Sequence, residues 1–175
     1  MMVNPFRGPV LVVVLLMAAL AHEQLSAQAP TTLKGNPLAG VIDFHVHSGP
    51  DSFTRSISDI EIARVARANK MGALVLKNHF TMTADRAALA MAQVAGLEIF
   101  GGVALNRAVG GINPEAVRQM VAFDGGRGRV VWLPTFDSEF YVTRAAGAES
   151  FVRVVQDGAP VPALLEVFGL VAERD

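Results

Sequence analysis

The sequence predicts an α/β fold in which four strand–helix units build a parallel sheet. Short aliphatic runs begin near residues 41, 73, 99 and 129. Each run is followed by a segment with helical spacing or helix-capping residues. The runs are apolar almost throughout, which is typical of strands covered on both faces. This pattern fits an open doubly wound sheet and a closed barrel equally well.

The strand predictions cover residues 41–47, 73–76, 99–105 and 130–133. The first helix is expected over 58–71, where Ser58 and Glu61 form a capping box. The second is expected over 83–95 with Thr83 as its cap, and the third opens at Asn113-Pro114, with Asn as cap and Pro at the first helical position. Pro162 opens the fourth helix, which is expected to run to about residue 173.

Composition narrows the classes of function. The 175-residue chain has a formal net charge of -1, which gives no reason to expect nucleic acid or an acidic membrane surface as a partner. It contains no cysteine, so disulfides, thiolate metal ligands and a cysteine nucleophile are excluded. Any metal must be held by His, carboxylate, modified Lys or water. A small-molecule substrate is the expected partner, and open sheet edges would also allow oligomers.

The N-terminus has the order of residues of a secretory signal peptide. Arg7 precedes an apolar run from Val10 to Ala21, and small residues follow around Ala27 and Ala29. Twelve apolar residues span about 18 Å as a helix, too short for a hydrocarbon core of about 30 Å. We therefore predict a signal peptide over 1–27, a linker over 28–40 and one domain over 41–175. The protein is expected to be exported, periplasmic or extracellular, without stable membrane insertion after cleavage.

The sharpest chemical signal is the run from Asp43 to His47. Side chains alternate along a strand, so Asp43, His45 and His47 share one face. The two imidazoles lie at the carboxyl end of the strand, where active sites of parallel α/β folds are found. We interpret His45 and His47 as metal ligands, with Asp43 orienting one of the rings. The alternative is a pair of hydrogen-bonded core histidines.

Later strand ends provide further candidates. Lys77 and His79 share one face at the end of the second strand, and carboxylation of Lys77 would turn its amine into an anionic bridging ligand. His79 is a candidate third metal ligand, with a loop histidine as the alternative. Arg107 and Asp137, in the loops after the third and fourth strands, are candidate substrate-binding residues. Asp51 and Thr135 could also reach the site, whereas Trp132 is expected in the core.

The segment Asp43-Phe44-His45-Val46-His47 resembles the first barrel strand of the amidohydrolase superfamily of metal-dependent hydrolases. Together with Val75 to His79, Leu105 to Pro114 and Val131 to Thr135, it looks like one uncharacterised family of that kind. The start HVHS and the Asn78-His79 pair are also similar to the polymerase-and-histidinol-phosphatase (PHP) family, although Asn78 replaces the usual Asp. The amidohydrolase resemblance implies a TIM-type barrel. A complete barrel takes about 250 residues, so we expect the N-terminal half of one, with four βα units and incomplete.

The resemblance implies hydrolysis by a metal-activated water at an amide, ester or similar bond, with Zn as the expected metal and Mn or Fe as alternatives. The bridging Lys or Glu that amidohydrolases carry on the fourth strand is missing from Val131 to Thr135, and Lys77 is a substitute. Three alternatives stay open. They are a PHP-like phosphoesterase, a non-catalytic barrel remnant, and an open-sheet binding protein that needs no metal.

Overall fold

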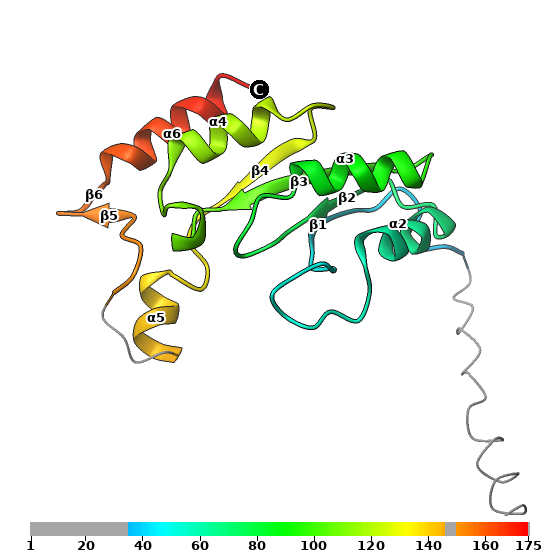
Figure 1. Ribbon diagram of the computed structural model, residues 1–175, viewed down its shortest axis with the longest axis horizontal. Coiled ribbons are helices and arrows are strands. Elements are labelled where there is room, and N and C mark those ends of the chain that lie inside the picture. Colours follow the sequence, from blue (N-terminus) through cyan, green and yellow to red (C-terminus); the bar gives the residue numbers. More distant parts are fainter. Residues whose placement is uncertain (1–34, 146–149, 175) are drawn as a thin grey trace, which may run out of the picture. The chain divides into compact units, whose positions relative to one another are not determined.

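The computed structural model of the protein describes residues 35–145 and 150–174 (Figure 1). The predicted signal peptide and most of the predicted linker lie outside these residues. Residues 36–175 form one compact unit, and its elements are described here.

The core of this unit is a four-stranded parallel sheet with the order β1-β2-β3-β4. The strands are β1 Ile42–Val46, β2 Ala73–Leu76, β3 Glu98–Ala104 and β4 Gly128–Trp132. All three neighbouring pairs are parallel. The prediction of a parallel sheet built from alternating strands and helices is therefore confirmed. The order does not reverse within these strands, whereas a doubly wound sheet reverses at its switch point.

Four helices follow the four strands, close to the predicted ranges. They are α2 Asp59–Ala68, α3 Ala84–Gln93, α4 Pro114–Ala122 and α6 Pro162–Ala172. The capping box of Ser58 and Glu61 forms as predicted, and Asn113 accepts from the backbone of Glu115. Both caps satisfy amide groups that the first helical turn leaves without partners.

Small and aliphatic side chains join the helices to one face of the sheet. Ala63, Ala66, Ala87 and Ala90 pack against the β2 residues Leu74 and Leu76 in one buried cluster. A second cluster joins Val103 and Leu105 to Val117 and Met120 of α4 and to Leu164 and Val167 of α6. Alanine on α2 and α3 lets these helices approach the sheet closely. The other face of β2 carries Val75 and Lys77, because side chains alternate along a strand.

Thr83 corrects one detail of the predicted second helix. It occupies the N-cap position of α3, but its side chain makes no capping hydrogen bond. Instead, its hydroxyl donates to the carbonyl of Leu76 at 2.7 Å and accepts from the amide of Gly102 at 2.9 Å. Thr83 is fully buried, so its hydroxyl satisfies backbone groups of β2 and β3 inside the fold.

The segment between β4 and α6 contains structure that the sequence pattern did not predict. A short helix α5 covers Glu139–Ala145, and a two-stranded hairpin joins β5 Val155–Gln156 to β6 Ala159–Pro160. Outside this segment, the short 3-10 helix η2 Arg107–Val109 lies between β3 and α4 and was not predicted either. These elements are too short to show a hydrophobic period.

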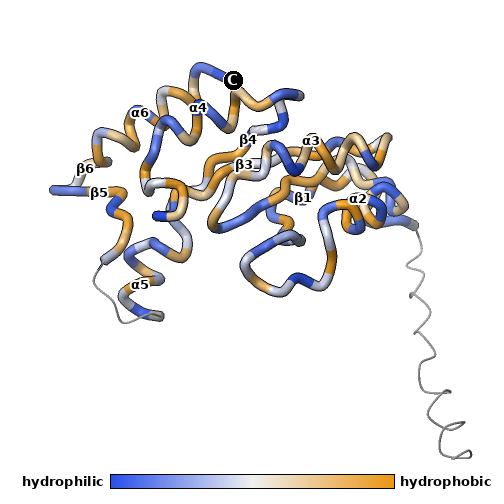
Figure 2. The backbone as a smooth tube through the Cα atoms, in the orientation of Figure 1, coloured by the Kyte–Doolittle hydropathy of each residue, from blue (hydrophilic) through white to orange (hydrophobic). Residues whose placement is uncertain are grey.

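The strands are not equally buried. Every residue of β2 is buried, as predicted, but β1 is exposed except at Val46. The prediction that each strand is covered on both faces is therefore wrong for β1, because β1 lies at the edge of the sheet. Ile42 and Phe44 are 48% and 62% exposed. The helix α6 is mostly hydrophobic (Figure 2). Leu165 and Phe168 on this helix are exposed to solvent.

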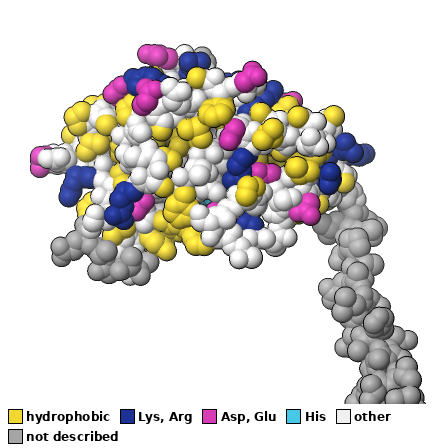
Figure 3. All heavy atoms as spheres, viewed as in Figure 1, with side chains coloured by type: hydrophobic (Ala, Val, Ile, Leu, Met, Phe, Trp, Pro, Cys, Tyr) yellow, Lys and Arg dark blue, Asp and Glu magenta, His cyan; other side chains and the backbone are white. Residues whose placement is uncertain are grey.

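Apolar side chains also reach the surface between charged groups on the face viewed in Figure 3. No helix among the described residues has the length and hydrophobicity needed to cross a membrane.

Candidate metal centre

The carboxyl ends of β1 and β2 bring three of the predicted site residues together. The Nε2 atoms of His45 and His47 lie 3.0 Å apart, and their rings are tilted by 57°. The Nζ of Lys77 lies 3.2 Å from Nε2 of His45. The alternation of β1 puts both imidazoles on the face away from the helices, and the parallel pairing places Lys77 beside them. Three nitrogen atoms therefore converge on one small region.

Lys77 is buried beside an aromatic ring. Its side chain is 4% exposed, and its Nζ lies 5.1 Å from the centre of the Trp132 ring. Gly102 makes room for this ring, since a Cβ atom there would lie 2.5 Å from Trp132 Cζ3. Among the described residues, no carboxylate pairs with Lys77. Burial lowers the pKa of the Lys77 amine, which makes its neutral, nucleophilic form easier to reach than in a solvated lysine.

The environment favours the neutral form of the two imidazoles, because it lowers the pKa of both. Partial burial and the nearby charge of Lys77 lower the pKa of His45. Burial and the guanidinium of Arg55 lower the pKa of His47. Arg55 is held by Asp51 at 2.6 Å, and its NH2 lies 3.4 Å from Nδ1 of His47. Asp51 thus reaches the site indirectly, through Arg55, a residue that the sequence pattern did not single out.

His79 lies next to this group in a different geometry. Its ring is stacked between His47, at a centroid distance of 4.7 Å and 20°, and Phe136, at 4.1 Å and 24°. A bound metal ion lies close to the plane of each imidazole that ligates it. Two rings stacked nearly parallel cannot both point to one ion, so this arrangement does not favour His79 as a ligand beside His47. Burial, with the charges of His47 and Lys77, lowers its pKa to about 4.

Among the described residues, the hydrogen bond of the Asp43 carboxylate goes to the backbone and not to an imidazole ring. Its Oδ1 accepts a 2.9 Å hydrogen bond from the backbone N–H of His45. The predicted bond from a ring nitrogen is therefore replaced by a backbone contact. The carboxylate still raises the proton affinity of His45 through its charge, against the larger effects of burial and Lys77.

The two predicted substrate-binding residues pair with each other. Asp137 Oδ1 lies 2.7 Å from Nε of Arg107, and its Oδ2 accepts from the backbone of Arg107 at 2.8 Å. The guanidinium therefore already has a carboxylate partner, although its side chain is 55% exposed. Their contact with substrate stays a prediction.

A buried network supports the loop that follows His47. The hydroxyl of Ser48 donates to Asp59 at 2.6 Å, and Arg86 donates to both carboxylate oxygens of Asp59 at 2.8 Å. Arg86 also reaches the carbonyl of Ser48 at 3.0 Å. Sequence reasoning missed these residues because Asp59 and Arg86 look like ordinary helix-surface charges.

Asn106 is the second residue that sequence reasoning missed as a site component. It is fully buried, and its amide contacts His79, Thr135 and Asp137. A polar residue directly after a buried strand was the available signal.

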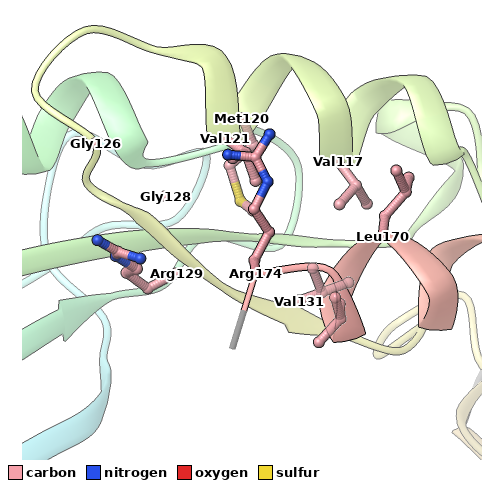
Figure 4. Close-up of a pocket in the computed structure, with 10 residues that line it drawn as sticks. Val117, Met120, Val121, Gly126, Gly128, Arg129, Val131, Leu170 and Arg174 are labelled. Carbon is pink, nitrogen blue, oxygen red and sulfur yellow. The ribbon is translucent and has the colours of Figure 1, made fainter.

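Two hollows lie near these elements. An open cleft of about 440 Å³ borders the loop after β1 and is lined by Asp51, Phe53, Arg55 and Glu61 among others. A second cavity of about 230 Å³ lies between α4, α6 and β4, with Val117, Met120 and Leu170 in its wall and Arg129 and Arg174 nearby (Figure 4). None of the histidines lines this second cavity, so it is separate from the candidate centre.

The donor set as a whole is rich in nitrogen and poor in carboxylates. Within residues 35–145 and 150–174, no group of three or more His, Asp and Glu side chains is placed to hold a metal ion. A metal here would need Lys77, water or groups outside the described residues in addition to His45 and His47.

No curated protein and no solved structure matches this chain significantly. Residues 40–175 match the family DUF6282, whose description is "Family of unknown function", and the match begins one residue before the domain boundary predicted from the sequence. Because this match covers most of its length, the chain belongs to the DUF6282 family.

Proposed function

We propose that this chain carries the metal-binding half of a metal-dependent hydrolase, with His45 and His47 as ligands. The observation that carries the proposal is the convergence of their Nε2 atoms, 3.0 Å apart, at the carboxyl end of a parallel strand. Two nitrogens held by one ion at about 2.0–2.1 Å lie about 2.9 Å apart at a right angle and about 3.3 Å apart at a tetrahedral angle. The observed separation falls in this range.

The protonation states also suit a metal. Ligating imidazole must be neutral, and burial lowers the pKa of both histidines, so they stay neutral to lower pH than free histidine. The positive charges of Lys77 and Arg55 oppose metal binding itself, because each would repel a cation. Carboxylation of the Lys77 amine would replace a positive charge by a negative one at the position 3.2 Å from His45. The residues fit a metal best with Lys77 in this modified form.

The sheet supports a TIM-type barrel as the wider architecture. Four parallel strands follow in sequential order, and the histidines lie on the face opposite the helices. In a barrel that face is the interior, and its carboxyl-terminal mouth carries the active site. The four units would then be half of an eight-fold barrel.

A bound divalent metal would supply a water of lowered pKa and would polarise the scissile group of the substrate. The side chains of this chain would position the ion and hold the loop beside it. His45 and His47 fix the position of the ion, and Asp59 and Arg86 hold the Ser48 loop that follows His47. The bond hydrolysed is an amide, ester or similar bond, and the substrate is a small molecule.

One observation favours a second candidate, a non-catalytic metal-binding or inert domain. Among the described residues, no further His, Asp or Glu side chain is placed with the two histidines to complete a metal site. A non-catalytic metal-binding domain would share metal binding through His45 and His47 with the hydrolase and differ from it in turnover, whereas an inert domain would lack both.

Elemental analysis tests the proposal. The secreted, full chain is purified without added chelator, and Zn, Mn and Fe are measured per chain in wild type, His45→Ala, His47→Ala and the exposed control Gln93→Ala. We expect metal in wild type and in the control, and a loss of at least tenfold in each histidine variant. Equal metal in all four proteins, or none in wild type, would overturn the proposal.

Turnover then separates the candidates. Wild type loaded with Zn is assayed on p-nitrophenyl acetate and on bis(p-nitrophenyl) phosphate. Hydrolysis of the ester favours the amidohydrolase type, and hydrolysis of the phosphodiester alone favours a PHP-like phosphoesterase. Bound metal without turnover favours the non-catalytic domain.

A further inference from the structure

A chain of hydrogen bonds fixes which nitrogen of His79 carries its proton. It begins at Asn106, where the backbone N–H groups of Thr135 and Asp137 both point at the side-chain amide, at 2.8 and 3.2 Å. A backbone N–H can only donate, so the atom that receives them must be the amide oxygen. The amide nitrogen of Asn106 therefore occupies the other position.

That nitrogen faces the hydroxyl of Thr135 at 2.8 Å and the backbone carbonyl of His79 at 2.8 Å. An amide nitrogen can only donate, so Thr135 Oγ1 accepts from Asn106. The Thr135 hydroxyl then has its own hydrogen to place. Its other partner among the described residues is Nδ1 of His79, also at 2.8 Å.

The best match of donors to acceptors has Thr135 donating to Nδ1 of His79. The reverse direction would leave the hydroxyl hydrogen of the partly buried Thr135 without an acceptor in the described part of the chain, and most polar groups in such positions are paired. A neutral imidazole that accepts at Nδ1 carries its proton on Nε2. His79 is therefore a donor at Nε2, and this protonated nitrogen has no lone pair with which to bind a metal.

Nε2 of His79 keeps some contact with solvent, although the residue as a whole is only 9% exposed. Within the described residues Nε2 makes no hydrogen bond, and no buried side-chain nitrogen or oxygen there lacks a partner. These two facts together place Nε2 in contact with solvent. Stacking on His47 and Phe136 holds the plane of the ring, so the N–H direction is fixed.

Aromatic rings pack beside His79, at 6.3 Å between ring centres for Phe80 and 4.1 Å for Phe136. Phe136 also contacts Phe53, at 5.7 Å between ring centres, and Tyr141, at 4.9 Å. Phe80 lies 5.8 Å from Phe53. A preorganised donor beside these rings, with the charges of Lys77 and Arg55 also acting on His79, stabilises a developing negative charge more strongly than water does.

We propose that His79 is a catalytic hydrogen-bond donor, whose Nε2–H binds the carbonyl or phosphoryl oxygen of the scissile group. Thr135 and Asn106 are positioning residues that set its tautomer. This inference rests on the proposed function, because it needs a hydrolytic site at His45 and His47. It gives His79 a role different from that of a metal ligand.

NMR spectroscopy of the full chain labelled with 15N tests this inference. The side-chain nitrogen resonances at pH 7.5 report which tautomer His79 adopts. The His79→Gln spectrum identifies the His79 signals by their loss. We expect Nε2 protonated and Nδ1 unprotonated in wild type and in Thr135→Ser. In Thr135→Val, which removes only the hydroxyl, we expect the single tautomer to be lost to a mixture. Protonated Nδ1 in wild type, or a spectrum unchanged by Thr135→Val, overturns the inference.

Metal content provides the second readout. Gln places an N–H near the position of Nε2, so His79→Gln should retain metal at the wild-type level, whereas a tenfold loss would show that His79 is a ligand and overturn the inference. Where turnover is measurable, kcat should fall at least tenfold more in His79→Leu than in His79→Gln, and an equal fall would overturn it. Wild type without metal defeats the proposed function and with it the catalytic role of His79, whereas the spectrum separately decides the tautomer.

Discussion

Removing the carboxylate of Asp59 is the sharpest test of how the fold supports the candidate site. Asp59 is 7% exposed and accepts three hydrogen bonds, two from Arg86 at 2.8 Å and one from Ser48 at 2.6 Å. The two ionic side chains are 8% and 13% exposed, so solvent screens the pair only weakly. Asp59→Ala leaves the Arg86 guanidinium buried without its partner.

The expected cost follows from this burial. Breaking a buried ion pair by removing one member costs about 3–5 kcal/mol. Asp59 also lies in the first turn of α2, where a negative charge contributes about 0.3–1 kcal/mol through the helix dipole. With a urea m-value of about 2 kcal/mol/M, a loss of about 3 kcal/mol lowers the midpoint by about 1.5 M.

The control isolates the buried network from the helix dipole. Asp85 occupies the first turn of α3 but is exposed, so Asp85→Ala should cost no more than about 1 kcal/mol. Urea unfolding followed by circular dichroism gives both values. A double variant, Asp59→Leu with Arg86→Leu, should be more stable than either single variant, because no charge is left buried alone. The reasoning is refuted if Asp59→Ala costs no more than Asp85→Ala.

Three further predictions concern pH, packing and export. The folded-state pKa of His79, about 4, lies below its unfolded value of about 6.5, so protons favour the unfolded chain. The free energy of unfolding should stay constant above about pH 6.5 and fall as pH drops toward about 4. Urea unfolding midpoints at pH 7.5, 6 and 5 measure this decline. The decline should be flatter in His79→Gln. Gly102→Ala would place a Cβ atom 2.2 Å from the Val130 carbonyl oxygen and should destabilise by about 1–3 kcal/mol. Gly169→Ala on α6 meets no atom within 4 Å and should instead stabilise by about 0.5–1 kcal/mol, and equal melting temperatures for the two variants would contradict this. Protein secreted by its host should begin near Gln28 or Pro30 on N-terminal sequencing, and an intact Met1 on cytoplasmic protein would reject export.

Local pattern determined most of the fold. The four strands and the helices that follow them were predictable because aliphatic runs, capping boxes and Pro at the first helical turn act over a few residues. The same locality explains what was missed. The helix α5 and the hairpin of β5 and β6 are too short for a hydrophobic period, and the exposure of β1 depends on which strands exist beside it.

The sequence by itself also determined that His45 and His47 share one strand face, because alternation along a strand is a local property. Only the tertiary structure decided which groups surround them. The parallel pairing of β1 and β2 brings Lys77 to His45, and the loops after β3 and β4 bring Asn106 and Thr135 to His79 across 27 to 56 positions of the chain. Hydrogen-bond direction and ring stacking depend on these long-range approaches, and no spacing within a single segment encodes them.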